Sequence, residues 1–373
     1  MIEDDTYRMS SQYRLWSYSP EQLHNQRVNT NHLASEKVRA AVSRARLSSV
    51  TGNGNGEQQQ HKGSAVTDIE TLTVDEELQI VRWGCQKILD MKNVFDHPLP
   101  SHVISTAIQY LRRFYLTNSP MTYHPKQIMV TALYLATKTE HHYTDINQYC
   151  APLTNVTPED VRAPEFLLMQ GLRFSLDVRH PARSLEGGVS EIKLHASALS
   201  CFNGEDRAAV DKRITKAAET ARRLLTTQVQ MTDAYFLYTP PQIYLAALLV
   251  TDKTLTTSYI DHLFSRLDTA IGPIKQKLLE TINGCADLIR AEQSSEADGE
   301  GTKKELARIG RKLKKCQDPE KTDIKALARA KATEKRETDA QDEEKVRKKR
   351  RLERERAERD GEVFGPELKD VGK

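Results

Sequence analysis

The chain has 373 residues, of which 38% are apolar, and its formal net charge is +3. This length and apolar content allow two ordinary domains with tails and exclude a chain that lacks a packed core. The longest apolar stretch, residues 243–250, is far shorter than the roughly 20 residues of a membrane-spanning helix, so we predict no membrane segment.

Five cysteines are widely spaced and form no CxxC pair. This usage is typical of a reducing compartment, the cytosol or nucleus, and predicts buried thiols in place of disulfides or structural zinc. Residues 301–360 hold 22 Lys/Arg against 14 Asp/Glu, so the rest of the chain is mildly acidic. Because a nucleic-acid-binding fold normally carries a basic face, we expect no direct nucleic-acid contact by the folded part.

The N-terminal region predicts helices. Ser19 reads as an N-cap, Pro20 as the first helical residue and Gln22 as the side chain that reaches back, although a Ser-Pro pair is also a candidate phosphorylation site. A second helical pattern covers about 31–48. The sequence GNGNGEQQQHKGS at 52–64 then predicts a flexible linker.

From Thr73 onward the chain reads as successive helices. Thr73 with Glu76 predicts a capping box that opens a helix to about residue 92, and Ser101 is expected to cap the next helix. A third helix begins at Pro125 and is apolar nearly all round over 128–136, which is typical of a helix enclosed by its neighbours. A short helix follows at 145–150, and a fifth is expected from Thr157 to about residue 173.

Part of this pattern recurs later in the chain. Pro125 matches Pro240 at an offset of 115 residues, and the same offset matches Lys138 with Lys253. One helix earlier, at an offset of 110, the pair at 112–113 matches Arg222 and Arg223. The repetition predicts two similar all-helical domains, each built around a buried central helix.

We therefore predict an all-α chain with five parts. These are N-terminal flanking helices (1–50), a flexible linker (51–69), a first helical domain (70–176), a second helical domain (177–292), and a charged C-terminal helix with a basic tail (293–373). In the tail, KVRKKRRLERER at 345–356 holds eight basic residues in twelve. That run is either a nuclear-import patch or a solvated charged helix.

No motif for catalysis or cofactor binding is present in the sequence. It contains no phosphate-binding glycine loop, no nucleophile elbow and no HExxH helix. His141 and His142 are adjacent, so on a helix they point about 100° apart and cannot chelate one ion together. We expect no catalytic residue, no metal and no cofactor, and hence an interaction protein.

Lys138 is the candidate with two open interpretations. In one interpretation Lys138 serves only its own helix, because a lysine at the C-terminal end of a helix is favoured by the helix dipole. Alternatively, it presents a fixed ammonium to a partner. Physical reasoning from the residues leaves both open, and the matching Lys253 supports a folding role.

Several ordered motifs resemble the cyclins. TAIQYLRRFYLTNSPMTYHPKQIMVTALYLATKTE looks like a first cyclin box, and VRAPEFLLMQGLRFSLDVRHP looks like its fifth helix and exit. MTDAYFLYTPPQIYLAALL, with the N-terminal QYRLWSYSPEQL and the late RKLKKC, resembles the cyclin H group in particular. The resemblance covers about residues 10–320 and implies two tandem five-helix cyclin folds with flanking terminal helices.

This resemblance implies a function. Cyclin H-like proteins are non-catalytic subunits that activate the cyclin-dependent kinase of the transcription factor IIH kinase module, together with a RING-finger assembly factor. The complex phosphorylates the RNA polymerase II C-terminal domain and other cyclin-dependent kinases, which implies a nuclear location. By the same resemblance, the kinase-binding residues expected here are Lys138, Glu165, Phe174, Met169 and Glu140.

Two departures from the family pattern qualify the expectation. The helix DEELQIVRWGCQKILDM lacks the Met-Arg-Ala-Ile-Leu patch with which cell-cycle cyclins recruit substrates, so we predict no such groove. Pro164 directly precedes Glu165, which predicts a kink or restart in the fifth helix. The alternatives are a transcription factor IIB-like protein that binds promoter DNA, although its zinc ribbon and basic folds are missing, and another transcriptional cyclin.

Overall fold

The computed structural model describes residues 2–51, 69–204, 206–265, 272–295 and 299–317, with parts of 323–355. The chain divides into two units, residues 1–321 and 322–373, and each is described by itself. The described residues contain helices and turns but no strand, so the predicted all-α class is confirmed. Among these residues, no helix is both long and apolar enough to cross a bilayer.

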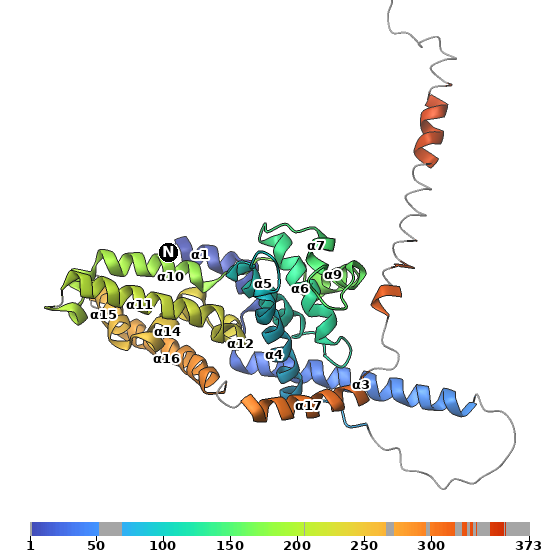
Figure 1. Ribbon diagram of the computed structural model, residues 1–373, viewed down its shortest axis with the longest axis horizontal. Helices are drawn as coiled ribbons and strands as arrows, with labels where there is room; N and C mark the ends of the chain where they lie inside the picture. The colour runs from blue at the N-terminus through green and yellow to red at the C-terminus, as the bar shows by residue number, and fades with distance from the viewer. Residues whose placement is uncertain are drawn as a thin grey trace, which may run out of the picture. The chain divides into compact units, whose positions relative to one another are not determined.

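A first group of helices surrounds one buried helix, α6 (Figure 1). Pro125 occupies the first turn of α6, where its missing N–H costs nothing, and the His124 side chain accepts a hydrogen bond from the Lys126 N–H. Most side chains of α6 are buried, on all sides of the helix, as the all-round apolar pattern predicted. The group comprises α4 (Val74–Asp90), the 3₁₀ turn η1 (Met91–Asn93), α5 (Ser101–Phe114), α6 (Pro125–Thr139), α7 (Ile146–Cys150), α8 (Pro158–Arg162) and α9 (Glu165–Gly171).

A second group surrounds α14 in the same manner. Pro240 starts α14, Thr239 and Gln242 form its capping box, and residues 243–249 are all buried. The helices α10, α11, α15 and α16 pack against it. The group comprises α10 (Pro181–Leu194), η2 (Ala196–Ala198), η3 (Ser200–Phe202), α11 (Arg207–Thr226), α12 (Gln228–Met231), α13 (Ala234–Leu237), α14 (Pro240–Thr251), α15 (Lys253–Ser265) and α16 (Gly272–Ser295).

The repeat in the sequence is therefore matched in the fold, but not at its last residue. Lys138 lies in the last turn of α6. Lys253 is instead the first residue of α15, because α14 ends at Thr251 and Asp252 adopts an extended conformation. The expectation that the two lysines share a helix-capping role is wrong, and it no longer supports a purely structural role for Lys138.

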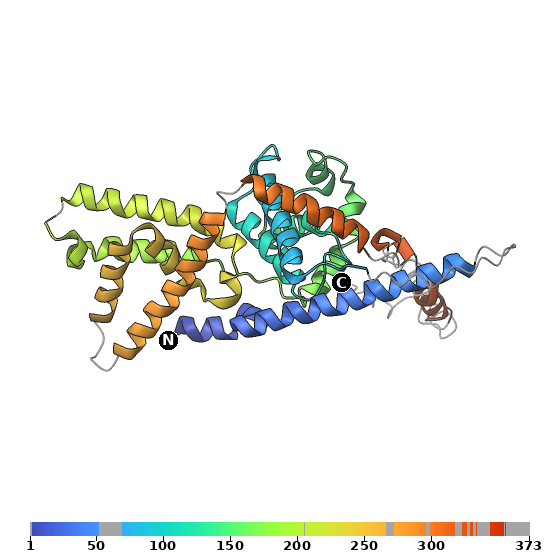
Figure 2. The same ribbon diagram turned by 90° about the horizontal axis from the view of Figure 1, so that it is seen from below.

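Two of the terminal helices, α3 and α17, pack against the first group through a small core of their own. The N-terminal helices are α1 (Ile2–Met9), α2 (Ser11–Trp16) and α3 (Pro20–Thr51), and the C-terminal helix is α17 (Gly299–Lys315). Figure 2 shows α3 as one long helix beside the first group, so the two helical patterns expected before residue 50 form a single helix. The small core consists of Ala34, Val38, Leu72, Ile80, Met121, Ile309, Leu313 and Cys316.

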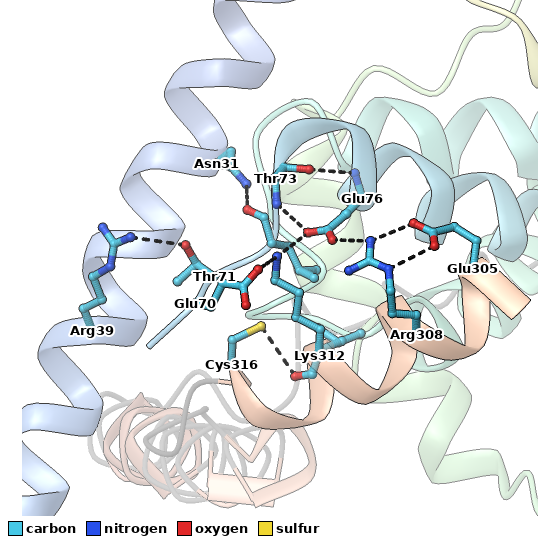
Figure 3. Close-up of polar contacts among 12 residues, drawn as sticks. Asn31, Arg39, Glu70, Thr71, Thr73, Glu76, Glu305, Arg308, Lys312 and Cys316 are labelled. Carbon is cyan, nitrogen blue, oxygen red and sulfur yellow. Dashed lines mark hydrogen bonds and ion pairs between the residues drawn. The ribbon is translucent and has the colours of Figure 1, made fainter. Parts of the chain in front are cut away.

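An ionic cluster at Glu76 fastens α17 to α4 (Figure 3). The Glu76 carboxylate accepts hydrogen bonds from the Thr73 N–H at 2.9 Å, from Arg308 at 2.7 Å and from Lys312 at 2.8 Å. Only 8% of this side chain is exposed. One carboxylate therefore caps the start of α4 and also holds the C-terminal helix.

The predicted helix starts and breaks have mixed outcomes. Ser19 and Gln22 exchange the expected hydrogen bonds, and the capping box of Thr73 with Glu76 is present. Ser101 is not an N-cap. It is the first helical residue after Pro100, and its hydroxyl accepts a hydrogen bond from Lys92.

Pro164 breaks the expected fifth helix. The first segment, α8, ends at Arg162, and α9 starts at Glu165. Proline removes a backbone donor and clashes with the preceding turn, which explains the break. The restart predicted from the sequence is confirmed.

In the second unit, residues 344–353 are helical and exposed. Lys348 pairs with Glu344 at 2.8 Å and Arg351 with Glu355 at 3.1 Å, each one helical turn apart. This segment of the basic run is thus a solvated charged helix. The predicted flexible linker, residues 51–69, lies outside the described residues apart from its two ends.

Candidate partner-docking site

Lys138 and Glu165 meet at one edge of the first helical group. Lys138 lies in the last turn of α6, and Glu165 is the first residue of α9. The Lys138 ammonium forms an ion pair with Glu165 Oε1 and lies 5.0 Å from the centroid of the Tyr134 ring. The two charged side chains stay 35% and 21% exposed, so a partner can reach both.

The break at Pro164 determines how Glu165 is presented. Pro164 is the N-cap of α9, and its carbonyl accepts the first helical hydrogen bond from the Leu168 N–H at 2.8 Å. Glu165 therefore occupies the first turn, where the positive end of the helix dipole favours a carboxylate. The restart thus places an acidic side chain at a helix N-terminus opposite the C-terminal end of α6.

Phe174 extends the site with exposed aromatic surface. Its side chain is 63% exposed, and Phe166 beside it is 49% exposed, with ring centroids 6.1 Å apart. Arg173 and Phe174 adopt φ values of 52° and 53°, a left-handed conformation that costs roughly 1 kcal/mol or more for a non-glycine residue. The Phe174 N–H donates to the Met169 carbonyl at 2.9 Å and closes the end of α9 in this conformation.

Met169 and Glu140 occupy different settings from the exposed ring pair. Met169 is half-buried and packs against the main core, so little of it reaches the surface. Glu140 ends α6 as its C-cap, and its carboxylate accepts a hydrogen bond from Thr106 Oγ1 at 2.7 Å. The structure therefore pairs Lys138 with Glu165, places Glu140 at the same end of α6 but against Thr106 of α5, and leaves Met169 mainly as support.

His141 and His142 form the turn after α6. His141 adopts φ 57°, and its ring contacts the Tyr143 hydroxyl at 3.2 Å. The His142 N–H donates to the Thr137 carbonyl at 2.8 Å and closes the helix end. Within the described ranges, no cluster of three or more histidine, cysteine or acidic side chains could hold a metal ion.

Comparison with known proteins identifies the family. The family described as the cyclin N-terminal domain matches residues 85–177, and the cyclin C-terminal domain matches residues 180–290. The cyclin Mcs2 of Schizosaccharomyces pombe is 33% identical over 69% of this chain and 73% of its own length. The chain belongs to the cyclin family, as a cyclin of the cyclin H type.

Other matches agree with this assignment. Cyclin CCL1 of Saccharomyces cerevisiae is 34% identical over 70% of this cyclin, which spans 62% of that longer relative. A chain of the CAK complex of Chaetomium thermophilum bound to ATP-gamma-S matches at 32% identity with a TM-score of 0.70, covering 90% of this chain and 96% of that one. A chain of the yeast TFIIK (Kin28/Ccl1/Tfb3) complex matches at 31% identity with a TM-score of 0.51, over 76% and 100%. The similarity favours the cyclin over the transcription factor IIB-like alternative.

In this cyclin, an N-terminal support beside the site was missed by sequence reasoning. Trp16 is fully buried, and its indole N–H donates to the Ser175 hydroxyl at 3.4 Å. The guanidinium groups of Arg113 and Arg173 lie 5.1 Å and 5.3 Å from the Trp16 ring. Trp16 therefore lies within cation–π distance of two guanidinium groups, one of which belongs to Arg173, the residue before Phe174.

Arg113 joins this N-terminal segment to the exit from the first cyclin box. Its guanidinium donates to the Asp177 carbonyl at 3.0 Å and to the Gln12 side chain at 3.3 Å. Burial lowers the pKa of Arg113 to about 10, which still leaves the group charged at neutral pH. Two signals were available, the motif QYRLWSYSPEQL, which contains Gln12 and Trp16, and the presence of only two tryptophans in the chain, since such residues are usually anchored.

Proposed function

We propose that this cyclin binds and activates a cyclin-dependent kinase of the transcription factor IIH kinase module. The complex then phosphorylates the RNA polymerase II C-terminal domain and other cyclin-dependent kinases in the nucleus. The cyclin supplies no catalytic group. A RING-finger assembly factor is its further partner, by analogy with the third subunit of the yeast TFIIK complex.

The observation that carries the proposal is the edge formed by Lys138 and Glu165. Both charges are reachable. Phe166 follows Glu165 in α9, and its exposed ring lies 6.1 Å from the exposed ring of Phe174, which comes just after that helix. Exposed aromatic surface next to a partly exposed ion pair is typical of a protein interface. The kinase-binding surface would consist of Lys138, Glu165 and Phe174, with Glu140 at the rim and Met169 beneath.

The proposed mechanism is stabilisation of one kinase conformation. An active protein kinase needs a glutamate of its αC helix paired with the lysine that orients ATP. A cyclin docked on the αC helix favours that arrangement. Its effect on the kinase equilibrium equals the difference between its affinities for the two conformations.

The two tandem boxes divide this work. We assign residues 70–176 to the kinase-docking box and residues 177–292 to a supporting box that stiffens the first. The flanking segments 1–50 and 293–317 pack against the docking box through α3 and α17. We expect no direct nucleic-acid contact by the folded body, because it lacks the basic excess that is found in residues 301–360.

The decisive experiment uses the full-length tagged chain. It is purified from its own cells, its bound kinase is identified by mass spectrometry, and the complex is assayed on a peptide of the polymerase C-terminal domain. Lys138→Ala with Glu165→Ala should weaken the affinity for that kinase about 100-fold, roughly 2.7 kcal/mol. The free energy of unfolding should change by less than about 1 kcal/mol, because the pair is partly exposed.

A matched control removes a similar ion pair elsewhere. Lys275 and Asp261 join α16 to α15 at 2.8 Å, with 35% and 51% of their side chains exposed. Lys275→Ala with Asp261→Ala should leave kinase affinity unchanged. Equal loss from both double variants, or a purified chain that binds promoter DNA and no kinase, would reject the proposed function.

A further inference from the structure

A partly buried chain of hydrogen bonds crosses from the second cyclin box to the end of α6. Glu140 accepts from Thr106 Oγ1 at 2.7 Å, and that hydroxyl lies 2.7 Å from His180 Nε2. His180 Nδ1 lies 3.0 Å from the Tyr235 hydroxyl. The chain continues from Tyr235 to Gln230 at 3.0 Å and from Gln230 to Gln109 at 3.0 Å.

The far end of the chain fixes the orientation of its amide groups. Gln230 Nε2 lies 2.8 Å from the Leu225 carbonyl, which can only accept, so this atom of Gln230 is the nitrogen. The same nitrogen donates to the Tyr235 oxygen, and Gln230 Oε1 accepts from Gln109. The phenolic proton of Tyr235 then points away from Gln230, toward His180.

The hydrogen bonds at Glu140 and Thr106 independently fix the direction in which the chain donates. The Glu140 carboxylate only accepts, so the single proton of the Thr106 hydroxyl points to it. The Thr106 oxygen must then accept from His180, which places the imidazole proton on Nε2. Nδ1 is left as the acceptor for the Tyr235 proton. The two ends therefore require the same histidine tautomer.

The titration properties of the chain agree with this direction. Burial, together with the nearby Arg113 charge, lowers the pKa of His180 to about 3, so the ring stays neutral. Burial raises the pKa of Tyr235, so its hydroxyl keeps its proton. Every donor in the chain thus points toward Glu140, and the bonds polarise one another in one direction.

Glu140 occupies a place that its own helix disfavours. As the C-cap of α6 it lies at the negative end of the helix dipole, where a carboxylate costs up to about 1 kcal/mol. The hydrogen bond from Thr106 offsets this cost and fixes the Glu140 carboxylate at the end of α6, the helix end that also carries Lys138. The helix dipole alone would favour a cation at this position.

We infer that Thr106 and His180 are positioning residues that hold Glu140 in register with Lys138 for the kinase, and that Tyr235 couples the second box to this edge. This inference rests on the proposed function. Glu140 accepts a hydrogen bond from a cationic or N–H group of the kinase. The supporting box therefore affects kinase docking through these hydrogen bonds as well as through its packing.

The first experiment removes and restores one hydroxyl. Thr106→Val keeps the shape of the side chain but leaves Glu140 without its buried donor, and should weaken affinity for the kinase identified above about tenfold. Thr106→Ser should restore it. Thr131→Val is the control, since the fully buried Thr131 donates to the Val161 carbonyl at 3.0 Å in the same box.

The outcomes separate positioning from stability. Thr131→Val should lower the melting temperature as Thr106→Val does, yet leave kinase affinity unchanged. In a Glu140→Ala background, Thr106→Val should cause no further loss of affinity. Equal affinity losses from the Thr106 and Thr131 variants, no loss from either, or additive effects in that background would overturn the inference.

The second experiment reads the tautomer without the kinase. Nitrogen-15 NMR of histidine-labelled full-length chain, with His180 assigned by His180→Gln, should show a neutral ring protonated at Nε2. Tyr235→Phe should shift the Nδ1 resonance, because it removes the donor to that atom. A ring protonated at Nδ1 would overturn the inference. A correct tautomer in a wild-type chain that binds no kinase would instead reject the proposed function.

Discussion

Two ionic clusters in the first cyclin box use the same chemistry for different purposes. At Glu76, one carboxylate with 8% exposure meets Arg308 and Lys312 and the start of its own helix. At Lys138, a single ammonium meets Glu165 with a third of its side chain exposed. The Glu76 carboxylate is buried and meets two cations of α17, whereas both members of the Lys138 pair stay partly exposed. Burial of the carboxylate and the number of its partners, more than charge type, distinguish this contact within the fold from the proposed docking site.

The largest expected effect comes from breaking the enclosed cluster. Glu76→Ala removes the capping carboxylate of α4 and leaves Arg308 and Lys312 without their buried partner. We expect the free energy of unfolding to fall by about 4 kcal/mol, because α4 loses its capping acceptor and the mostly buried Lys312 loses a charged hydrogen bond, although Glu70 and Glu305 still pair with the two cations. Denaturant unfolding of the full-length chain measures this, and kinase affinity per folded molecule should not change.

Glu305 provides the control for this prediction. Its carboxylate also pairs with Arg308 at 2.7 Å, but 41% of its side chain is exposed and it caps no helix. Glu305→Gln should leave stability nearly unchanged. If it destabilised the chain as much as Glu76→Ala, the distinction between enclosed and exposed clusters would fail.

The two clusters were not equally visible in the sequence. The capping box of Thr73 with Glu76 is a local pattern of spacing three and was predicted directly, but its pairing with Arg308 spans more than 230 residues. Local periodicity contains no information about which cation arrives from that distance. The C-terminal helix was expected, whereas its place on α4 came only from the fold.

The docking edge shows the same division. Lys138 and Glu165 were located through family motifs, and the restart at Pro164 followed from proline geometry. The tautomer of His180 could not be predicted, because it depends on Thr106 and Tyr235 from two other helices. Likewise, Lys253 matches Lys138 at the offset of 115 residues but begins a different helix. A match between repeats in the sequence does not determine where each helix ends.

The neighbouring residue Glu77 sharpens the comparison, because it is equally buried but pairs with no cation among the residues that the structure describes. Burial raises the pKa of Glu77 to about 7, although hydrogen bonds from Ser119 and Asn31 oppose the shift. At Glu76 burial acts in the same direction, but the hydrogen bonds from Lys312, the Thr73 N–H and Arg308 win and lower its pKa. The pKa values of these two adjacent carboxyl groups on α4 are therefore shifted in opposite directions.

This difference predicts a pH dependence of stability. Between the usual pKa of 4.5 and about 7, the folded chain holds the Glu77 proton that the unfolded chain has lost. The contribution is complete below that window and disappears as the pH rises through it, a loss of about 3 kcal/mol in unfolding free energy. Glu77→Gln should flatten the profile between pH 5 and 7 and be more stable than wild type at pH 8. Denaturant unfolding at several pH values tests this, and an unchanged slope would contradict it.

The smallest expected change in stability concerns Phe174, on the exposed part of the proposed kinase-binding surface. Phe174→Gly relieves the left-handed backbone conformation, which offsets the lost ring contact, so the free energy of unfolding should stay level or rise by up to about 1 kcal/mol. Kinase affinity should nevertheless fall, because the exposed ring is gone. Leu194→Gly at the end of α10, where 77% of the leucine is exposed, is the control and should leave affinity intact. If Phe174 lowers the stability of the chain but raises its affinity for the kinase, the strained backbone at this residue serves the partner. Wild-type affinity in Phe174→Gly would show instead that the strained turn serves the fold.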